Sequence, residues 1–378
     1  MKYNPEHFQP NVWQRITKII SSNRIGSAYL FSGPEGTGKE AAALAFSAAL
    51  NCQGNEIICG SCSSCVRFSS LQHEHLHVIV PLPRKKANFD KDTDVLSIIG
   101  DDNAALLTDL LQKKGTDPFQ KINIPRAKRI LINSIRELRK KLYLKSVESG
   151  YKMVLIFDAH CLSDGDGASA NALLKLLEEP PKKTTVILVT DYKSMLLSTI
   201  QSRCQQIDFP PISHDIVSTY LTDRGIHSGE AEFYANLADG NIHKARFLAD
   251  RTVAEILKTM KDQVEAVVNS NGDGWRSYIN NMSRMVRSDP NNFKFHLFLL
   301  QTWFQQSVRF RQNISSPLAQ NGFGEALKTF TTSYPQANLT TANSVIETTI
   351  ASIDRNFYMP LTLTNMLIDI QHYLKGKA

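Results

Sequence analysis

Apolar positions along the first 211 residues form short continuous runs separated by stretches with helical spacing. Continuous runs of four to six apolar residues are typical of buried strands, and repeats at three and four residues are typical of amphipathic helices. Strand and helix therefore alternate, which predicts an α/β domain with a mostly parallel sheet and helices on both faces. The predicted strands cover 28–32, 78–81, 153–157 and 185–190, and the clearest helices cover 12–20, 39–51 and 169–179.

The pattern becomes wholly helical after residue 211. Residues 212–251 contain amphipathic stretches and fit a small helical lid, whereas 252–378 carry leucine and aromatic stripes typical of a helix bundle. We therefore expect three domains, 1–211, 212–251 and 252–378.

Composition places the chain among ordinary globular proteins. It has 378 residues, 42% of them hydrophobic, with a net charge of +7. No apolar run approaches the roughly 18 residues of a membrane span, and the first residues lack the apolar core of a signal peptide. We therefore expect a cytoplasmic protein with no membrane partner, whose basic balance permits contact with nucleic acid.

Residues 28–40 read AYLFSGPEGTGKE and predict a phosphate-binding loop between a strand and a helix. Gly33 and Gly38 let backbone N–H groups point inward, and Lys39 adds a positive charge at the start of the helix. The usual loop ends with a hydroxyl that holds the magnesium ion of a nucleotide, but Glu40 stands there. A nucleotide site is expected from the glycines and the lysine, whereas Glu40 argues against hydrolysis; a plain glycine turn is the alternative.

Two later strand ends belong to the same predicted site. Asp158 ends the strand 153–157, where a carboxylate can reach a nucleotide-bound magnesium ion. Ala159 follows it, so the glutamate that commonly polarises the attacking water in ATP-hydrolysing enzymes is absent. Thr190 ends the next strand beside the expected nucleotide.

Four cysteines follow the first α/β turn with the spacing C-x6-C-x2-C-x2-C. Four thiolates in one short loop can surround a tetrahedral zinc ion, and an all-sulfur set leaves no position for a reactive water. We therefore expect structural Zn²⁺, with an iron–sulfur cluster as the weaker alternative. The four predicted ligands are Cys52, Cys59, Cys62 and Cys65.

Residues 83–125 lose clean periodicity and predict a surface insertion that is helical around 104–113. From residue 126 to 145 the pattern predicts a helix with a dense basic face. Such a run is most often a solvated face, but it is also the best candidate in the first half for contact with a phosphate backbone. Its candidate residues are Lys128, Arg129, Arg136, Arg139 and Lys140.

Several motifs together resemble the bacterial clamp-loader ATPases of the AAA+ class. GPEGTGKE, the four-cysteine loop, VLIFDAHCLS, NALLKLLEEPP and QSRCQQIDF occur in that family's order and spacing, over about residues 8–250 without the insertion. The resemblance implies an AAA+ domain, a helical lid and a C-terminal helical collar, in a cytoplasmic assembly of five subunits around primed DNA. In such proteins the arginine of the SRC triplet acts on a neighbouring subunit's ATP, a role that would fall on Arg203.

Three departures from the hydrolysing members of that family point the same way. They are Glu40 after the loop lysine, Ala159 after the strand aspartate, and His243 where the lid usually carries an arginine. The resemblance thus implies a non-hydrolysing subunit of a DNA polymerase assembly, with other loader subunits, the sliding clamp and primed template DNA as partners. An ATP-hydrolysing motor subunit and a basic zinc-containing DNA-binding module are the two alternatives.

Overall fold

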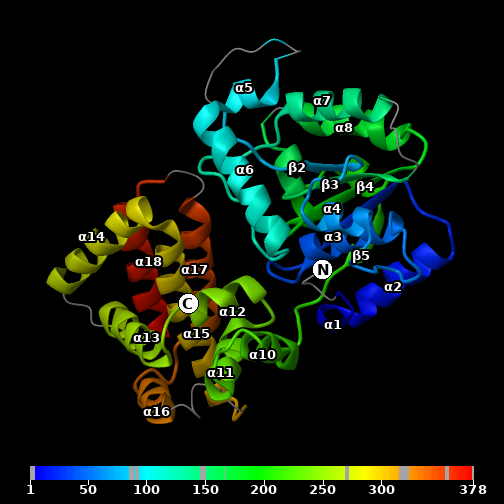
Figure 1. Cartoon of the computed structure of the whole chain (residues 1–378). Coiled ribbons are helices and arrows are strands. Elements are labelled where there is room, and N and C mark those ends of the chain that lie inside the picture. The colour runs from blue at the N-terminus through cyan, green and yellow to red at the C-terminus, as the bar shows by residue number, and fades with distance from the viewer. Residues whose placement is uncertain are drawn as a thin grey trace. The chain divides into compact units, whose positions relative to one another are not determined.

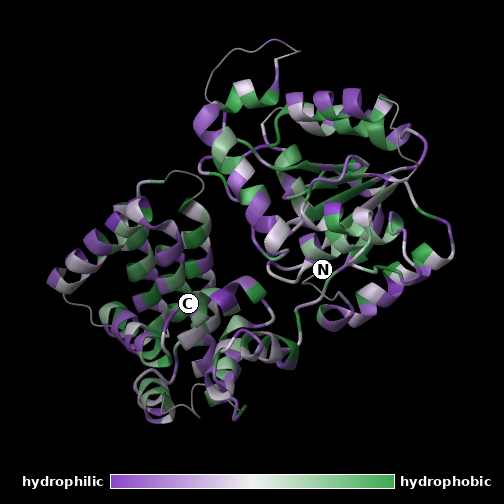
Figure 2. Cartoon of the chain, in the orientation of Figure 1, coloured by the Kyte–Doolittle hydropathy of each residue, from purple (hydrophilic) through white to green (hydrophobic). Residues whose placement is uncertain are grey.

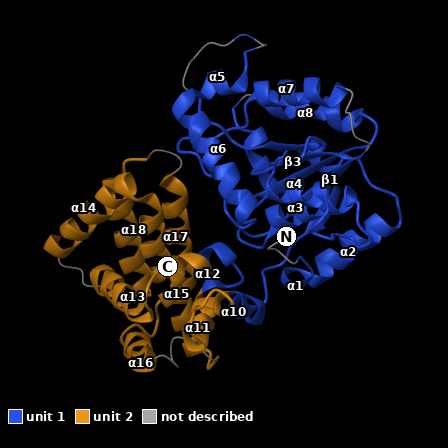
Figure 3. Cartoon of the chain, in the orientation of Figure 1, with its two compact units in different colours: residues 1–220, 238–244 blue, residues 221–237, 245–378 orange. Residues whose placement is uncertain are grey.

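A computed structural model of the chain describes residues 5–84, 90, 93–144, 150–165, 167–268, 272–314, 323–353 and 357–376. The chain forms two compact units, which Figure 3 colours separately. Unit 1 comprises Met1–Tyr220 with Ala238–Lys244, and unit 2 comprises Leu221–Leu237 with Ala245–Ala378.

The core of unit 1 is a five-stranded sheet in which every neighbouring pair of strands is parallel, as the alternating pattern predicts. The strand order is β2-β3-β4-β1-β5, so the first strand of the chain lies inside the sheet. Figure 1 labels β2, β3, β4 and β5 of this sheet. The strands are β1 (Ala28–Ser32), β2 (Leu76–Ile79), β3 (Lys152–Ile156), β4 (Thr184–Thr190) and β5 (Gln205–Asp208).

Both faces of the sheet are covered by helices, because the side chains of each central strand alternate between two apolar layers. On one face Tyr29 of β1 packs edge-on against Phe46, with ring centroids 5.3 Å apart. On the other face Leu30 belongs to a buried cluster with Leu138 and Leu173. Every residue of β1 and β4 is buried, and the strands of the sheet are mostly green, and so mostly apolar, in Figure 2.

The helices of unit 1 connect these strands and close the sheet. Phe46 lies on α3, and Leu138 and Leu173 lie on α7 and α8. The elements are α1 (Pro5–Phe8), α2 (Pro10–Ser21), α3 (Lys39–Leu50), α4 (Ser63–Ser69), α5 (Val95–Ile99), α6 (Asp101–Thr116), α7 (Ile132–Tyr143), η1 (Ala159–Leu162), α8 (Ala168–Glu178), η2 (Lys193–Met195) and α9 (Ser198–Gln201).

The predicted helix 126–145 is wrong over its first six residues. Arg126 has a left-handed backbone, with φ 64°, and Arg129 accepts a hydrogen bond from Leu82 N–H through its carbonyl oxygen at 3.0 Å. This bridge to an extended segment prevents a helix before Ile132. The basic residues 128 and 129 therefore precede α7 rather than lying on it, and residue 145 is outside the described residues.

The insertion 83–125 contains α5 and α6, and residues 85–89 and 91–92 within it are outside the described residues. Helix α6 extends the predicted stretch 104–113 at both ends. Asp101 and Asp102 lie in its first turn and Lys113 and Lys114 in its last, an arrangement that complements the helix dipole.

Unit 2 is entirely helical in its described part, as predicted for the last third of the chain. Helix α15 forms its centre, with Phe293, Leu297 and Phe304 fully buried. Three further helices, α10 (His214–Thr222), α11 (Ser228–Ala238) and α12 (Ile242–Ala249), span the expected lid and cross the division between the units. The remaining helices are α13 (Val253–Val268), α14 (Gly272–Ser288), α15 (Pro290–Arg311), α16 (Gly324–Ser333), α17 (Leu339–Ser352) and α18 (Met359–Leu374).

No helix in the described part of the chain is long and apolar enough to span a membrane.

Candidate functional site

The predicted phosphate loop connects β1 to α3, at the carboxyl end of the central strands. Gly33 fits closely against the chain after β5, since a Cβ there would lie 2.2 Å from the carbonyl oxygen of Phe209. Gly38 has φ 81° and occupies the N-cap of α3, a conformation that favours glycine. The local structure of the loop therefore favours glycine at both predicted positions.

The loop lysine is folded back into its own loop. Lys39 is 4% exposed, and its ammonium donates hydrogen bonds to the Gly33 carbonyl at 2.9 Å and the Thr37 hydroxyl at 3.2 Å. It also forms a 2.7 Å ion pair with Asp191, directly after β4. Burial alone would raise the pKa of Asp191, but neighbouring Lys121 and Lys39 lower it. The charge that would bind a phosphate is therefore already paired.

Glu40, which stands where the usual loop has a hydroxyl, forms an ion pair with Lys114 of α6. Lys114 is 1% exposed, and its ammonium also donates to the carbonyl oxygens of Pro118 at 3.1 Å and Gln120 at 2.8 Å. Burial tends to raise the pKa of Glu40, yet the adjacent Lys114 ammonium outweighs it and holds the pKa low. Glu40 thus anchors the last part of the insertion.

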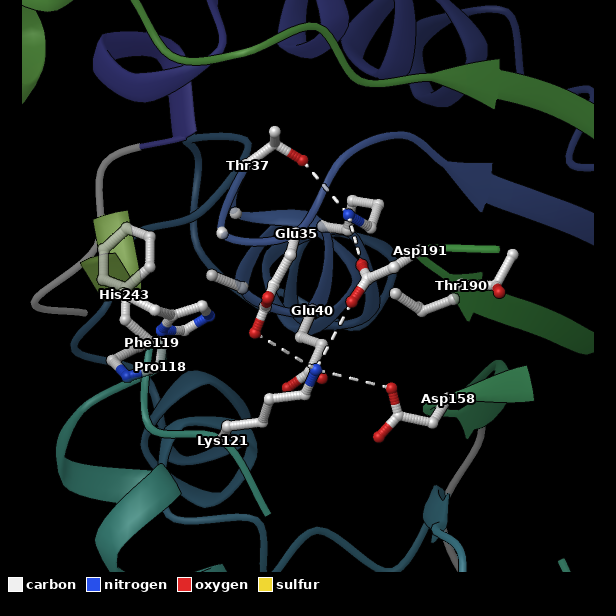
Figure 4. Close-up of a pocket in the computed structure, with 15 residues that line it drawn as sticks. Glu35, Thr37, Glu40, Pro118, Phe119, Lys121, Asp158, Thr190, Asp191 and His243 are labelled. Atoms are coloured by element: carbon white, nitrogen blue, oxygen red, sulfur yellow. Dashed lines mark hydrogen bonds and ion pairs between the residues drawn. The ribbon is translucent and has the colours of Figure 1, made fainter. Parts of the chain in front are cut away.

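A second lysine from the insertion enters the pocket itself. The ammonium of Lys121 lies 3.3 Å from Asp191, 3.6 Å from Asp158 and 3.8 Å from Glu35, as Figure 4 shows. Burial opposes its charge, but Asp158 and Asp191 raise its pKa overall. The side chain is 31% exposed. Lys121 therefore remains a cation among three carboxylates.

The two predicted strand-end residues line the same pocket. Asp158 has a left-handed backbone, with φ 48°, and burial raises the pKa of its carboxyl, although Lys121 opposes this. The Thr190 hydroxyl accepts a hydrogen bond from Tyr192 N–H at 3.0 Å and lies 3.2 Å from Nδ1 of His160. Asp158 therefore faces a lysine, and the hydroxyl of Thr190 is engaged locally.

The start of α12 packs over the phosphate loop within unit 1. Ile242 N–H donates to the Gly36 carbonyl at 3.0 Å, and Asn241 Oδ1 accepts from the N–H of His243 at 2.9 Å. His243 lines the pocket, and burial lowers its pKa. The cavity that remains has a volume of about 20 Å³, enough for roughly one water molecule.

These residues do not fit a magnesium–nucleotide complex in the described arrangement. The loop lysine and the strand aspartate are both paired within the protein, and a lysine stands among the carboxylates that would approach a metal ion. A nucleotide also needs far more space than one water molecule.

The four predicted zinc ligands come together beside α3 and α4. Their sulfur atoms all lie within 4.8 Å of one another, and the Cys59 and Cys65 sulfurs are 4.0 Å apart. A tetrahedral zinc ion with Zn–S bonds of about 2.3 Å requires sulfur separations of about 3.8 Å. Backbone N–H groups of Cys59 and Cys62 donate to the sulfurs of Cys52 and Cys59 at 3.4 and 3.3 Å. The loop can therefore bind a tetrahedral metal ion.

Arg203 lies away from the phosphate-loop pocket, in the turn after α9. Its guanidinium donates to the Glu178 carboxylate at 2.7 Å and to the Thr199 carbonyl at 2.9 Å. The side chain is 37% exposed and that of Glu178 is 48% exposed. Arg203 is thus partly exposed, and it is not among the residues that line the pocket of its own loop.

The predicted basic residues are not brought together on one helix. Arg136, Arg139 and Lys140 lie on α7, with Arg136 half-buried and the other two exposed. Lys128 and Arg129 are exposed in the segment that precedes it.

Comparison with known proteins assigns the sequence of this chain to a family. A family model described as "DNA polymerase III, delta subunit" matches residues 8–213, which include the loop, the cysteines, Asp158 and Arg203. The chain belongs to this family. Its membership agrees with the clamp-loader resemblance of the motifs and with the parallel sheet described above.

Relatives of this family member include two subunits from Bacillus subtilis (strain 168). DNA polymerase III subunit delta' is 30% identical over 232 residues, covering 61% of this chain and 56% of the relative. DNA polymerase III subunit tau is 29% identical over 272 residues, covering 68% of this chain and 40% of the relative. The chain thus spans about half of the length of these relatives.

Among solved structures, a DNA polymerase III gamma subunit-related protein from Thermotoga maritima is 15% identical. It covers 96% of this chain and 100% of its own, with a TM-score of 0.41. The family assignment rests on the sequence match and not on this similarity.

The sequence alone singled out the loop, Asp158 and Thr190 as site residues, but it did not single out three further charged residues of the pocket, or Lys114 beside Glu40. Glu35 is inside the loop motif, and Asp191 directly follows Thr190. Lys114 and Lys121 lie in the insertion, which has no regular pattern. The acidic residue at position 40 was the available signal, because a buried carboxylate requires a cationic partner.

Proposed function

We propose that this family member is a non-hydrolysing subunit of a DNA polymerase III clamp loader. It completes the ATP site of a neighbouring subunit and helps to load a sliding clamp on primed DNA during replication. Other loader subunits, the clamp and primed template DNA are its partners. The matches to subunits delta' and tau supply this setting.

The ion pair between Glu40 and Lys114 is the observation that carries the proposal. Glu40 replaces the hydroxyl that would hold a magnesium ion, and its ion pair with Lys114 of α6 supports a structural role for the replacement. The residue after Asp158 is Ala159, which begins η1 and cannot polarise water. Both groups that assist hydrolysis elsewhere are therefore missing.

Arg203 supplies the contribution to a neighbour. Its partly exposed guanidinium forms a surface ion pair with Glu178 and a hydrogen bond to the Thr199 carbonyl. A surface pair of this kind is weak enough to be exchanged for a phosphate. In this proposal Arg203 stabilises negative charge on the phosphoryl group transferred in the adjacent subunit.

The cysteine loop is proposed to hold structural Zn²⁺ through Cys52, Cys59, Cys62 and Cys65. Four thiolates saturate a tetrahedral ion, so the metal braces the loop that follows α3 and takes no part in a reaction. The exposed residues of α7 and the preceding segment remain candidates for DNA contact.

The test measures ATP turnover by the purified chain alone and by the reassembled loader with primed DNA. The chain alone should show no turnover. Arg203→Ala should lower turnover by the loader by up to about 10³–10⁵-fold, the range of arginine fingers, while leaving its folding intact. Unchanged turnover in the assembled loader would remove this role from Arg203.

A motor subunit is the second candidate, because the chain keeps Gly33, Gly38, Lys39 and Asp158 and is also similar to subunit tau. Turnover by the chain alone that Lys39→Ala abolishes would favour it over the first proposal.

A further inference from the structure

The insertion 83–125 ends in a segment that enters the phosphate-loop pocket, and the contacts of this segment indicate a purpose for it. Pro118, Phe119 and Lys121 line the pocket together with the phosphate loop, Asp158 and Thr190 (Figure 4). The carboxylates of the pocket would repel one another in a space of this size without a cation.

We propose that Lys121 is the built-in cation of this pocket, standing in for the divalent metal that accompanies a nucleotide and thereby excluding magnesium–nucleotide. Its ammonium is within 4 Å of Glu35, Asp158 and Asp191. A magnesium ion is held by carboxylates and phosphate oxygens. The Lys121 ammonium lies among the carboxylates that could bind such an ion and provides positive charge to them instead.

The position of Lys121 is fixed by the residues that precede it. Lys114 reaches from Glu40 to the carbonyl oxygens of Pro118 and Gln120, so two points of the segment are tied to α3 through one buried ammonium. The segment cannot leave the pocket without exposing or breaking this buried pair.

An aromatic cluster also holds the same segment. Phe119 packs against Phe8 with ring centroids 4.9 Å apart and against Tyr220 at 5.6 Å. Because Phe119 is 5% exposed, its burial favours the inserted position of the segment.

The pairing of the other groups in the pocket agrees with a closed site. The two oxygens of Asp191 face different lysines, Lys39 at 2.7 Å and Lys121 at 3.3 Å. Each cation of the site is thus used within the protein, and each carboxylate next to Lys121 already has a counter-ion. The departure at Glu40 and the insertion act together, since Glu40 anchors the segment that delivers Lys121.

The inference deepens the proposed function and rests on it for the lack of hydrolysis, but its test measures binding. The 378-residue chain and its Lys121→Met variant are titrated with Mn²⁺, which is followed by electron paramagnetic resonance. They are also titrated with labelled ATP in the presence of Mg²⁺ or of a chelator. The wild type should bind no Mn²⁺ in this pocket, and Mg²⁺ should not strengthen any ATP binding. Lys121→Met should gain Mn²⁺ affinity of at least about tenfold, with Mg²⁺-dependent ATP binding.

Three further variants keep the result interpretable. Lys121→Arg retains the cation and should behave as the wild type, whereas Asp158→Asn combined with Lys121→Met should lose the gained Mn²⁺ site. Lys113→Met removes an exposed lysine of α6, paired with Asp109, and should change nothing. Circular dichroism confirms that each variant is folded, and Lys121→Gln replaces Lys121→Met if the latter is not.

The inference is overturned if the folded Lys121→Met variant, or Lys121→Gln in its place, gains no metal binding, or if the wild type binds ATP more tightly with Mg²⁺ than without it. Either result leaves the proposed function intact, because that proposal fails only through turnover by the chain alone or through an Arg203→Ala variant without effect in the loader.

Discussion

Replacing Lys114 with methionine tests whether the Glu40 ion pair is part of the fold. The Lys114 side chain is 1% exposed and the Glu40 side chain 18% exposed. The variant keeps the apolar stem but leaves a largely buried carboxylate and two carbonyl oxygens without this donor. Breaking a buried pair from one side typically costs about 3–5 kcal/mol, so the free energy of unfolding of unit 1 should fall by about that amount at pH 7.

The measurement must read unit 1 alone, because unfolding of a chain with two units need not be a single transition. Urea denaturation followed by pulsed hydrogen exchange in peptides from α3 and α6 meets this need. Lys113→Met is the matched control, one residue away, since Lys113 and its partner Asp109 are 59% and 49% exposed. An exposed pair of this spacing contributes about 0.3–0.5 kcal/mol.

The effect of pH gives a second readout. The pKa of Glu40 is lowered from 4.5 in the folded wild type, where Lys114 outweighs the effect of burial. The contribution of Glu40 to the free energy of unfolding is therefore present above about pH 4.5 and is lost as the pH falls through the folded pKa. In Lys114→Met the lowering by Lys114 is lost, so the folded pKa of Glu40 rises relative to the wild type. Acid then protonates the carboxyl in the variant first, and the stability deficit of the variant shrinks as the pH falls. A loss equal to that of Lys113→Met at pH 7, or a deficit that stays constant down to pH 4, would refute the reasoning.

Three other expectations follow from described residues. The purified chain should contain about one zinc ion, and Cys59→Ser should lower the metal content measured by plasma mass spectrometry; visible absorbance typical of an iron–sulfur cluster would contradict zinc. Arg139→Glu should weaken DNA binding by the chain and reduce its salt dependence, whereas Lys258→Glu on α13 should not; equal effects would exclude a specific role for α7. Burial, together with nearby lysines, lowers the pKa of His77 from 6.5 to about 4. Between these pH values the unfolded state therefore binds more protons than the folded state. The free energy of unfolding should fall as the pH drops from 6.5 to 4, by at most about 3 kcal/mol. His77→Gln should make the urea midpoint of unfolding depend less on pH between 6.5 and 4. An unchanged pH dependence would contradict this role of His77.

Most of the sheet could be predicted because its strands carry their signal locally. β1, β3 and β4 are continuous apolar runs, which is what burial on both faces demands. β5 was not predicted, since only Ile207 of its four residues is buried and the rest are polar. Its pairing with β1 is set by the sheet and not by its own composition.

Residues of the candidate site could likewise be predicted only where their signal is local in the sequence. The phosphate loop is a contiguous motif, and Asp158 follows an obvious strand, so spacing was sufficient to find them. Lys114 and Lys121 are 74 and 81 positions from Glu40 in a region without periodicity, and only the folded chain brings Lys114 to Glu40 and Lys121 into the pocket. The start of α7 was missed for a related reason, because a long-range bridge at Arg129 overrides a helical pattern.

The pair between Glu40 and Lys114 also constrains how sequences of this kind can diverge. A substitution of Glu40 by serine or threonine would restore the usual loop motif but leave Lys114 buried without its carboxylate. Replacing Lys114 by an uncharged residue would instead leave the Glu40 carboxylate without this cation. Positions 40 and 114 should therefore change together among descendants of this chain, and a lineage that regained the hydroxyl alone would pass through a less stable intermediate.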